Sequence, residues 1–384
     1  MKYSCITLIL CLCTILALAS PVPSGAQKSE IVDSQGQGGK LIEFDAPNAG
    51  TAPGLGTVAF ANNNLGVIVG YYTDANIVPH GFLRTVAGKI ISFDAPGAGL
   101  QAGADQGTVA YSINDLGVIA GQFEDPNNIF HGFVRYSNGN FVTFDSPGAG
   151  TTANQGTLPI DINLSGGVAG VFLDGNYFEH GFVRLPNGKI TSFEAPDASP
   201  ASFGTQVCEE TCLNNQGAIT GEYYDANNAS HGFVRQADGK ITEFDAPGAG
   251  TGTYQGTIGA SINDEGTITG YFLDSNNVAH GFVRTSDGKF TTFDDPKAST
   301  NPGEGTAAFS INLTGAVTGE FLDANSVMHG FSRSSSGSFV NFDAPHAGIF
   351  SGQGTRPSTN NQLGAVAGWY VDGNDLSHGF VWCP

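Results

Sequence analysis

Seven histidines recur in a frame whose residue types could bind a metal ion or transfer protons. Each stands in a His-Gly-Phe tripeptide, with an Asp six residues before it and an Asn two positions after that Asp. Asp, Asn and His supply the oxygen and nitrogen atoms that cation binding and acid–base chemistry require. The histidines are His80, His131, His180, His231, His280, His329 and His378, and the aspartates are Asp74, Asp125, Asp174, Asp225, Asp274, Asp323 and Asp372.

A structural role explains this frame better than a catalytic one. A group required in every copy of a repeat is usually required for the repeat itself. We therefore expect Asp and Asn to close a loop through Asx-turns, and His to bridge to a neighbouring backbone or carboxylate. Binding of Ca²⁺ by the Asp-x-Asn loops is the alternative, and no other cofactor or metal is expected. An Arg that follows each of the first six tripeptides by one residue is expected to pair with an acid.

The repeats predict short antiparallel strands. Successive histidines are 49 or 51 residues apart, and each copy also carries a Gly-Thr pair, an Asn-x-x-Gly turn and a Phe-acid-x-Pro element. In one copy, residues 108–113, 118–123, 132–136 and 141–144 are rich in β-branched and aromatic residues and are separated by turn signals. Four such strands per unit of about 50 residues are typical of a β-propeller blade.

We predict an all-β, seven-bladed propeller closed by its own N-terminal strand. The last unit ends after its third strand, whereas residues 39–45 form an unattached fourth strand before the first unit. Pairing of these segments would leave no open end, which an open β-solenoid, the competing architecture, would have to cap. The predicted blades are 56–95, 107–145, 156–194, 204–245, 256–294, 305–343 and 354–383 with 39–45, all within a domain of residues 39–384.

These units resemble the extracellular HAF repeat family, in which a His-small-Phe core recurs at a similar period. The resemblance covers residues 39–383, with Gly where the family name implies Ala. It implies an extracellular protein and carries no settled activity.

The N-terminus and the charge balance indicate export and limit the partners. Residues 1–26 read as a secretory signal peptide with a short apolar run and a small-residue cleavage site, and residues 27–38 as a linker. We expect a secreted or periplasmic monomer without a membrane span. The formal net charge of −20 argues against nucleic acid, because phosphate binding needs a basic surface.

Three cysteines follow the predicted signal peptide. Cys208 and Cys212 lie in the one unit that carries about three extra residues, and a disulfide between them could staple this insertion. Cys383 would then stay free.

Residues particular to one unit are the candidates for a binding site, because a ligand lacks sevenfold symmetry. In a propeller, the connections between units and the loops between second and third strands share one side, called here the loop face. We expect the site on this face. The candidates are Asp161, Glu209, Arg356, His346, Tyr254 and Phe350, with Phe130 and Phe178 as further aromatic residues.

Three functions remain open at this point. A non-catalytic propeller that binds a carbohydrate or protein partner on the loop face is favoured. The first alternative is an extracellular polysaccharide hydrolase or lyase, which would require Asp161, Glu209 and Arg356 to converge in one cavity. The second is a structural exoprotein of the cell envelope, with bland, polar loops.

Overall fold

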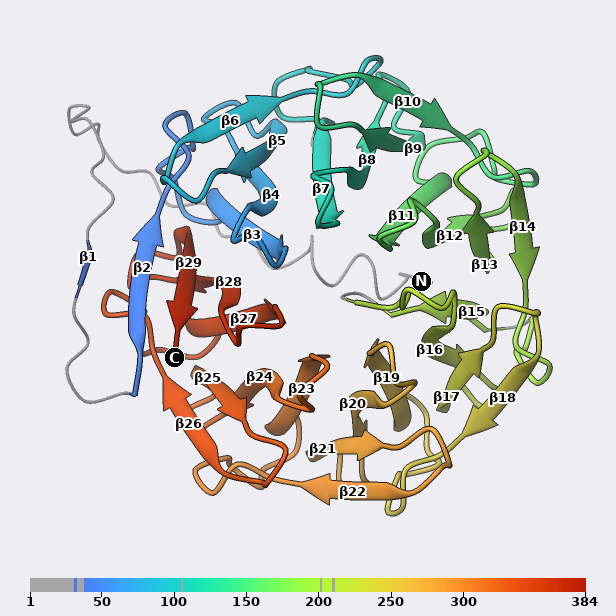
Figure 1. Ribbon diagram of the computed structural model, residues 1–384, viewed down its shortest axis with the longest axis vertical. Helices are drawn as coiled ribbons and strands as arrows, with labels where there is room; N and C mark the ends of the chain where they lie inside the picture. Colours follow the sequence, from blue (N-terminus) through green and yellow to red (C-terminus); the bar gives the residue numbers. More distant parts are fainter. Residues whose placement is uncertain (1–30, 33–37, 105, 201, 209–210) are drawn as a thin grey trace.

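The structure is a computed structural model that describes residues 31–32, 38–104, 106–200, 202–208 and 211–384. The predicted signal peptide and Glu209 lie outside these residues. Every regular element in the described ranges is a β-strand, so the all-β prediction is confirmed. The strands form repeated antiparallel units placed radially around a centre, as in a β-propeller (Figure 1). No helix suitable for crossing a membrane occurs in the described ranges.

The two inner strands of each unit carry most of the buried residues. The innermost strands are β3 (Gly56–Asn62), β7 (Thr108–Ile113), β11 (Gly156–Ile162), β15 (Thr205–Val207), β19 (Gly256–Ile262), β23 (Gly305–Ile311) and β27 (Gly354–Asn360). The second strands are β4 (Ile68–Thr73), β8 (Ile119–Glu124), β12 (Val168–Leu173), β16 (Ile219–Tyr224), β20 (Ile268–Leu273), β24 (Val317–Leu322) and β28 (Val366–Val371).

The two outer strands carry the histidine and the Phe-acid element. The third strands are β5 (Pro79–Arg84), β9 (Phe130–Arg135), β13 (Glu179–Arg184), β17 (Ser230–Arg235), β21 (Ala279–Arg284), β25 (Met328–Arg333) and β29 (Ser377–Cys383). The outermost strands are β6 (Ile90–Phe93), β10 (Phe141–Phe144), β14 (Ile190–Phe193), β18 (Ile241–Phe244), β22 (Phe290–Phe293), β26 (Phe339–Phe342) and β2 (Lys40–Phe44). A two-residue strand, β1 (Ile31–Val32), lies in the predicted linker and pairs with β2.

The Asn-x-x-Gly segments form the tight turns between first and second strands. In the second unit, Gly117 adopts φ of 72° and its N–H donates to the carbonyl of Asn114. Glycine is favoured there because left-handed backbone strains other residues. We call the side that carries these turns the turn face. The inter-unit connections contact the second-to-third-strand loops on the opposite side, where the N–H of Gly103 donates to the carbonyl of Asn76.

The Gly-Thr pairs connect each unit to the one before it. Gly305 pairs in parallel with Ala279 of the preceding third strand, and a side chain at Gly305 would collide with the Ala279 carbonyl. The hydroxyl of the following Thr306 accepts a hydrogen bond from the N–H of Asp295 at 2.9 Å. The same threonine contact occurs in all seven units.

The N-terminal strand β2 pairs with β29 near the C-terminus. Their antiparallel register runs from Lys40 opposite Cys383 to Phe44 opposite Gly379. β29 also pairs in parallel with β3 of the first unit, through Ser377 and Gly56. Hydrogen-bond pairing divides the strands into a set of eight, β7–β14, and a set of 21 that holds the others.

Aromatic packing forms the core between and within the units. The Phe of every His-Gly-Phe is fully buried. It contacts the Phe of the preceding outermost strand edge to face, as in the pair Phe44 and Phe82, whose ring centroids are 6.1 Å apart. Each junction between units is thus an apolar interface as well as a hydrogen-bonded one.

Candidate functional site

The seven histidines bridge two carboxylates in each unit. In the first unit, His80 Nδ1 lies 2.8 Å from Asp94 Oδ1, and His80 Nε2 lies 3.7 Å from Asp74 Oδ2. The imidazole also stacks on Tyr72, at 5.1 Å between centroids. The hydrogen bond to Asp94 raises the pKa of His80. Equivalent contacts recur in every unit, which supports the structural interpretation of the frame.

The aspartates of the Asp-x-Asn loops form the expected Asx-turns. Asp74 Oδ1 accepts hydrogen bonds from the N–H groups of Asn76 and Val78, at 2.8 and 3.0 Å. Burial opposes ionisation, but these main-chain bonds outweigh it and lower the pKa of Asp74. Within the described ranges, no group of three or more His, Cys, Asp or Glu side chains is arranged to hold a metal ion.

The expectation that the repeated arginines pair with acids was wrong. The Arg84 guanidinium lies over the Phe44 ring of the neighbouring outermost strand, 4.7 Å from its centroid. The same cation–π contact occurs at the five junctions that follow. Burial beside an aromatic face favours this arrangement because guanidinium is weakly hydrated. In the last unit, Trp382 takes the place of the Arg and stacks on Phe342 at 4.5 Å.

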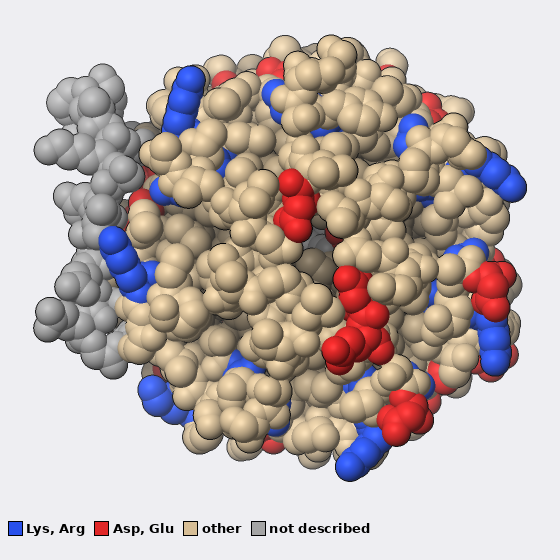
Figure 2. Space-filling model, viewed as in Figure 1, with Lys and Arg blue, Asp and Glu red and all other residues tan. Residues whose placement is uncertain are grey.

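A polar cavity occupies the centre of the turn face. Its volume is about 170 Å³, and it is lined by residues of six innermost strands, by the turns that follow five of these strands, and in the fourth unit by Thr211 and Leu213 with the turn after them rather than by β15. The turn asparagines donate from unit to unit, each Nδ2 to the main-chain carbonyl of the next asparagine, and Asn361 donates to Asn63. Figure 2 shows acidic side chains beside a central hollow, and Asp115 and Asp264 are among the lining residues.

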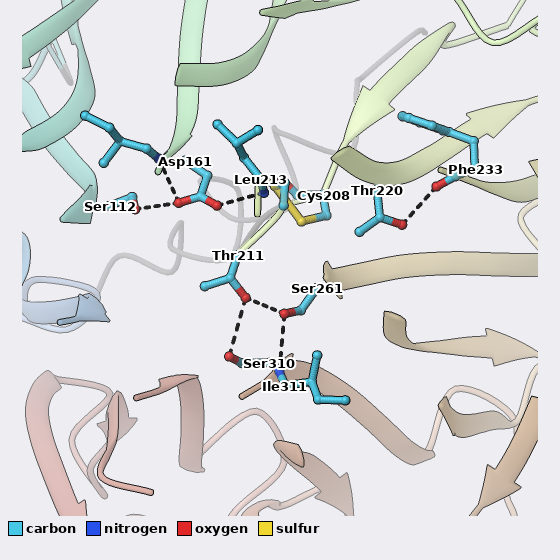
Figure 3. The surroundings of a disulfide bond; sticks show 12 residues. Ser112, Asp161, Cys208, Thr211, Leu213, Thr220, Phe233, Ser261, Ser310 and Ile311 are labelled. Atoms are coloured by element: carbon cyan, nitrogen blue, oxygen red, sulfur yellow. Dashed lines mark hydrogen bonds between the residues drawn. A yellow bond between two sulfur atoms is a disulfide. The ribbon is translucent and has the colours of Figure 1, made fainter. Parts of the chain in front are cut away.

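Asp161 lies in this cavity wall, at the turn end of β11, and not on the loop face where we expected the site. Its Oδ1 accepts hydrogen bonds from the Ser112 hydroxyl at 2.6 Å and the Ile162 N–H at 2.7 Å, and its Oδ2 accepts one from the Leu213 N–H at 2.9 Å (Figure 3). The carboxylate therefore connects three consecutive units. Burial raises its pKa, although these hydrogen bonds oppose the shift.

Asp161 accepts a main-chain hydrogen bond from the next unit, as hydroxyl side chains do elsewhere in the repeat. The N–H of Ile311 donates to Ser261 Oγ, that of Asn360 to Ser310 Oγ, and that of Asn62 to Thr359 Oγ1. The Leu213 N–H is the equivalent donor in the fourth unit. This unit is irregular: β15 has three residues, and a disulfide joins Cys208 to Cys212 (Figure 3). Leu213 still pairs with Ile219, as Ile311 does with Val317, so Asp161 serves a donor that keeps its place in this irregular unit.

Arg356 lies in a different place, at the loop end of β27. Its Nε is 3.8 Å from Glu320 Oε2, and its guanidinium lies 5.3 Å from the Phe309 ring and 5.8 Å from the Trp369 ring. Tyr271 contacts Phe309 edge to face. Burial raises the pKa of Glu320, and the nearby Arg356 opposes that shift. We call Tyr271, Phe309, Glu320, Arg356 and Trp369 the Arg356 cluster.

The Arg356 cluster is partly exposed. The side chains of Arg356, Tyr271 and Trp369 are partly exposed, and neighbouring units cover both faces of their sheets (Figure 1). A second aromatic group stands on the first two units, where Phe60 stacks on Tyr111 at 5.1 Å and contacts Tyr71 at 5.5 Å. The sequence analysis did not single out these aromatic residues. Their signal is two strand positions that rings occupy in only some units: Phe60, Tyr111 and Phe309 share one position, and Tyr71, Tyr271 and Trp369 share another, where the remaining units have Gln122, Val171, Glu222 and Glu320.

The remaining candidates lie on the loop face. Tyr254 and Phe350 are 57% and 66% exposed. Tyr254 adopts φ of 62°, contacts Phe203 at 6.1 Å, and occupies a left-handed position that Gly54, Gly103, Gly303 and Gly352 fill in other units. His346 Nδ1 lies 2.6 Å from Glu43 Oε2.

Two of the aromatic candidates are not exposed rings available for ligand binding, and one exposed ring was not predicted. Phe130 is buried, and Phe178 contacts His180 edge to face. Tyr177, beside Phe178, is 53% exposed, and its hydroxyl donates to the Ala153 carbonyl at 3.0 Å.

Asp161 and Arg356 do not converge as a hydrolase would require. Arg356 is not among the residues that line the cavity of Asp161, and every oxygen of Asp161 already accepts a hydrogen bond. Glu209, the third member of the proposed set, lies outside the described residues.

Comparisons with solved structures identify the fold. The BP39L lectin from Burkholderia pseudomallei superposes with a TM-score of 0.52 and 11% identity, over 91% of this chain and 98% of the lectin. A puromycin hydrolase matches with a TM-score of 0.50 and 12% identity, over 84% of this chain and 50% of the enzyme. No family model matches the chain, and no curated protein matches it significantly. The resemblance to HAF repeats therefore stays a prediction. At these identities the structural matches establish an all-β repeat fold of the β-propeller type.

Proposed function

We propose that this chain is a closed seven-bladed propeller that is exported and binds carbohydrate without catalysis, on the loop side of its centre. Three contacts support the ring: β2 completes the sheet of β29, β29 pairs with β3, and Asn361 donates to Asn63. The predicted signal peptide and the HAF resemblance support export, and we propose that the exported protein is a monomer.

The choice of carbohydrate as the ligand rests on the Arg356 cluster. Sugars present an apolar C–H face and several hydroxyls, so their sites combine aromatic rings with a few placed polar groups. Trp369 and Tyr271 supply partly exposed rings, and Arg356 supplies donors held beside the Glu320 carboxylate. The BP39L lectin matches this chain over nearly its whole length, which agrees with this choice.

Exposed aromatic residues on the same side extend the proposed site. Tyr254, Phe350 and Tyr177 stand on the connections and loops of that face, where a longer glycan or a glycoprotein could reach them. A polar loop surface, as expected of a purely structural exoprotein, would lack such side chains. Asp161, by contrast, belongs to the scaffold of the opposite face.

A glycan screen of the purified full-length product tests the proposal. Trp369 lies in the cluster, whereas the other tryptophan, Trp382, is buried between strands. Sugar binding should therefore change the tryptophan fluorescence. Arg356→Val, which introduces the residue found at Val58 and Val109, should abolish this change while the melting temperature is maintained.

The matched control is Arg84→Gln, which removes an arginine of the repeated frame and should leave sugar affinity unchanged. Absence of binding across neutral and acidic glycans would favour the structural role. Binding that Arg356→Val leaves intact would place the site elsewhere.

A further inference from the structure

Large apolar side chains are exposed at the tips of the turns on the turn face. The turns between first and second strands carry five leucines, which are between 41% and 76% exposed: Leu65, Leu116, Leu164, Leu313 and Leu363. Glycine and small polar residues are sufficient to form such turns. The fourth unit has Asn215 and Gln216 there, and the fifth has Asp264 and Glu265, so turn geometry does not require the leucines.

The turns between third and fourth strands extend this apolar set over the first three units. Val86, Tyr136 and Leu185 stand there and are 68%, 38% and 43% exposed. A side chain at Gly66 would lie 3.6 Å from Val86, so the two turns of one unit are neighbours. We call the five leucines and these three residues the apolar sector, which covers the sixth, seventh, first, second and third units. Exposed apolar patches of this kind mark interaction surfaces.

Hydrogen bonds hold the tips of the apolar sector at a common level. Each turn asparagine donates to the carbonyl of the next one, for example Asn63 to Asn114 at 3.1 Å and Asn114 to Asn163 at 3.0 Å. The leucines follow these asparagines by one or two residues. Projecting tips at one level suit a flat partner, whereas small molecules require a concave site.

Lysines lie on the same face, at its edge. Five units have an exposed lysine where the chain enters the outermost strand: Lys40, Lys89, Lys189, Lys240 and Lys289. Figure 2 shows basic side chains at the circumference of this face and acidic ones near its hollow. Lys40, Lys89 and Lys189 belong to units of the apolar sector, and Asp115 is the one acid among the turn residues of these units.

Most of the acidic frame lies at the opposite face. Both carboxylates of each histidine bridge, such as Asp74 and Asp94, are at the loop end of their unit. A strand of six residues such as β4 spans about 20 Å, whereas the Debye length is about 8 Å at physiological ionic strength. The acids of the loop face are therefore screened at the apolar sector, where the nearby lysines determine the local potential.

We propose that the apolar sector binds the surface of an anionic phospholipid bilayer. The exposed tips enter the boundary between headgroups and acyl chains, and Lys40, Lys89 and Lys189 lie among the anionic headgroups. The polar turns of the fourth and fifth units stay clear of the lipid, and the loop face points away from it. A second copy fits this surface less well, because stacking by the same face brings two sets of lysines together. The inference does not depend on the proposed sugar binding.

Flotation of the purified full-length product with lipid vesicles tests the proposal. Vesicles of equal parts phosphatidylglycerol and phosphatidylcholine should bind the protein, and pure phosphatidylcholine should bind it more weakly. Added salt should weaken binding to the mixed vesicles. The combined variant Leu65→Gln, Leu116→Gln and Leu363→Gln, which installs the residue found at Gln216, should weaken binding by at least about 100-fold, because three leucines no longer enter the lipid. Lys89→Asn, which installs the residue found at Asn140, should weaken binding to the mixed vesicles alone, by about 5-fold.

Ile349→Thr is the matched control, because Ile349 is 75% exposed on the loop face and its equivalents are Thr51 and Thr251. This variant should leave vesicle binding unchanged, as should Arg356→Val. All variants keep residues 1–26, so any difference between them arises elsewhere in the chain.

Binding that the leucine variant leaves intact would overturn the proposal, as would equal losses in Ile349→Thr and the leucine variant. Failure to bind mixed vesicles, or a preference for pure phosphatidylcholine, would also overturn it. Sedimentation without lipid addresses the remaining partner. A dimer that the leucine variant dissociates would contradict lipid binding and would assign this surface to a second copy of the chain.

Discussion

The innermost strands depart from the repeat in different ways at their two ends, the turn end and the loop end. At the turn end, Asp161 replaces a hydroxyl residue and still accepts the N–H of the next unit, as Ser261 and Ser310 do. At the loop end, Arg356 stands where five units have an aliphatic residue and the fourth has Gln206, and its guanidinium contacts Glu320, Phe309 and Trp369. A residue can thus be particular to one unit and still serve the scaffold, so departure from the repeat identifies a binding site only when the interaction changes as well.

The largest expected effect concerns the proposed ring closure, on which both ends depend. Deleting residues 27–47 removes β2 and exposes the edge of β29, together with the buried positions of Leu41 and Phe44. Each large apolar side chain contributes about 1.5–3 kcal/mol, so the free energy of unfolding should fall by several kcal/mol. Thermal melting measures this loss. An unchanged melting temperature would contradict the closed ring and, with it, the comparison of its two ends.

Asp161→Ala should have the next largest effect on the free energy of unfolding, because we expect Asp161 to stabilise the fold and not to bind the ligand. It leaves the Leu213 N–H and the Ser112 hydroxyl without their acceptor in a buried site, at a cost of about 2–6 kcal/mol for two unmet groups. Asp161→Ser should recover only part of this loss, because the shorter side chain offers one acceptor. Denaturant unfolding gives both values. A stable Asp161→Ala protein with lost sugar affinity would show that the turn end is functional after all.

The repeated histidines should contribute a smaller, pH-dependent stabilisation. Asp94 raises the pKa of His80 in the folded protein, so this contribution is complete below the unfolded-state pKa of about 6.5 and is lost as the pH rises through the folded-state value. Melting temperature should therefore decrease more steeply above neutral pH in the native protein than in His80→Gln. Identical pH profiles of the melting temperature for the two proteins would contradict a pH-dependent stabilisation by His80.

His180→Ala and His280→Ala extend the test to other units. Each should lower stability by about 1–3 kcal/mol, with similar values, because each imidazole bonds a carboxylate and stacks on a ring. A histidine whose removal abolished binding without affecting stability would contradict the frame interpretation.

Sequence patterns predicted most of the scaffold. Turn chemistry and strand composition placed β7 and β10 at their observed bounds, and the Asx-turns and the histidine–carboxylate bridges followed from residue type and repetition. The arginine contacts could not be predicted in the same way. Acids abound in the sequence, whereas the Phe rings that receive the arginines belong to the preceding unit and become neighbours only through the packing between blades.

The candidate site was harder to predict, because the contacts of a side chain depend on neighbouring units. A bulge interrupts the pairing of β11 with β12 between Pro159 and Asp161, and the same bulge recurs in five other units, so it belongs to the repeat and does not set Asp161 apart. Sequence comparison of the units identified Arg356 and Asp161 equally well, and their spacing from the Gly-Thr pair and the Asn-x-x-Gly turn assigns them to opposite ends of the first strand, but it carried no information on what each side chain would contact. Phe60 and Trp369 were not predicted as site residues because aromatic residues are common in strands.

Tyr254→Gly should have the smallest effect on stability and sharpens the comparison most. Tyr254 stands in left-handed backbone where four other units have glycine, and its ring is more than half exposed. Glycine would relieve a strain of about 1–2 kcal/mol while losing the contact with Phe203, worth about 0.5–1.5 kcal/mol, so the free energy of unfolding should change by no more than about 1 kcal/mol. If the ring instead serves the ligand, affinity for a long glycan should fall while affinity for a monosaccharide at the Arg356 cluster is unchanged. Titration of both ligands against the variant distinguishes the roles: a loss of more than about 2 kcal/mol of stability with intact glycan affinity would make Tyr254, like Asp161, part of the scaffold.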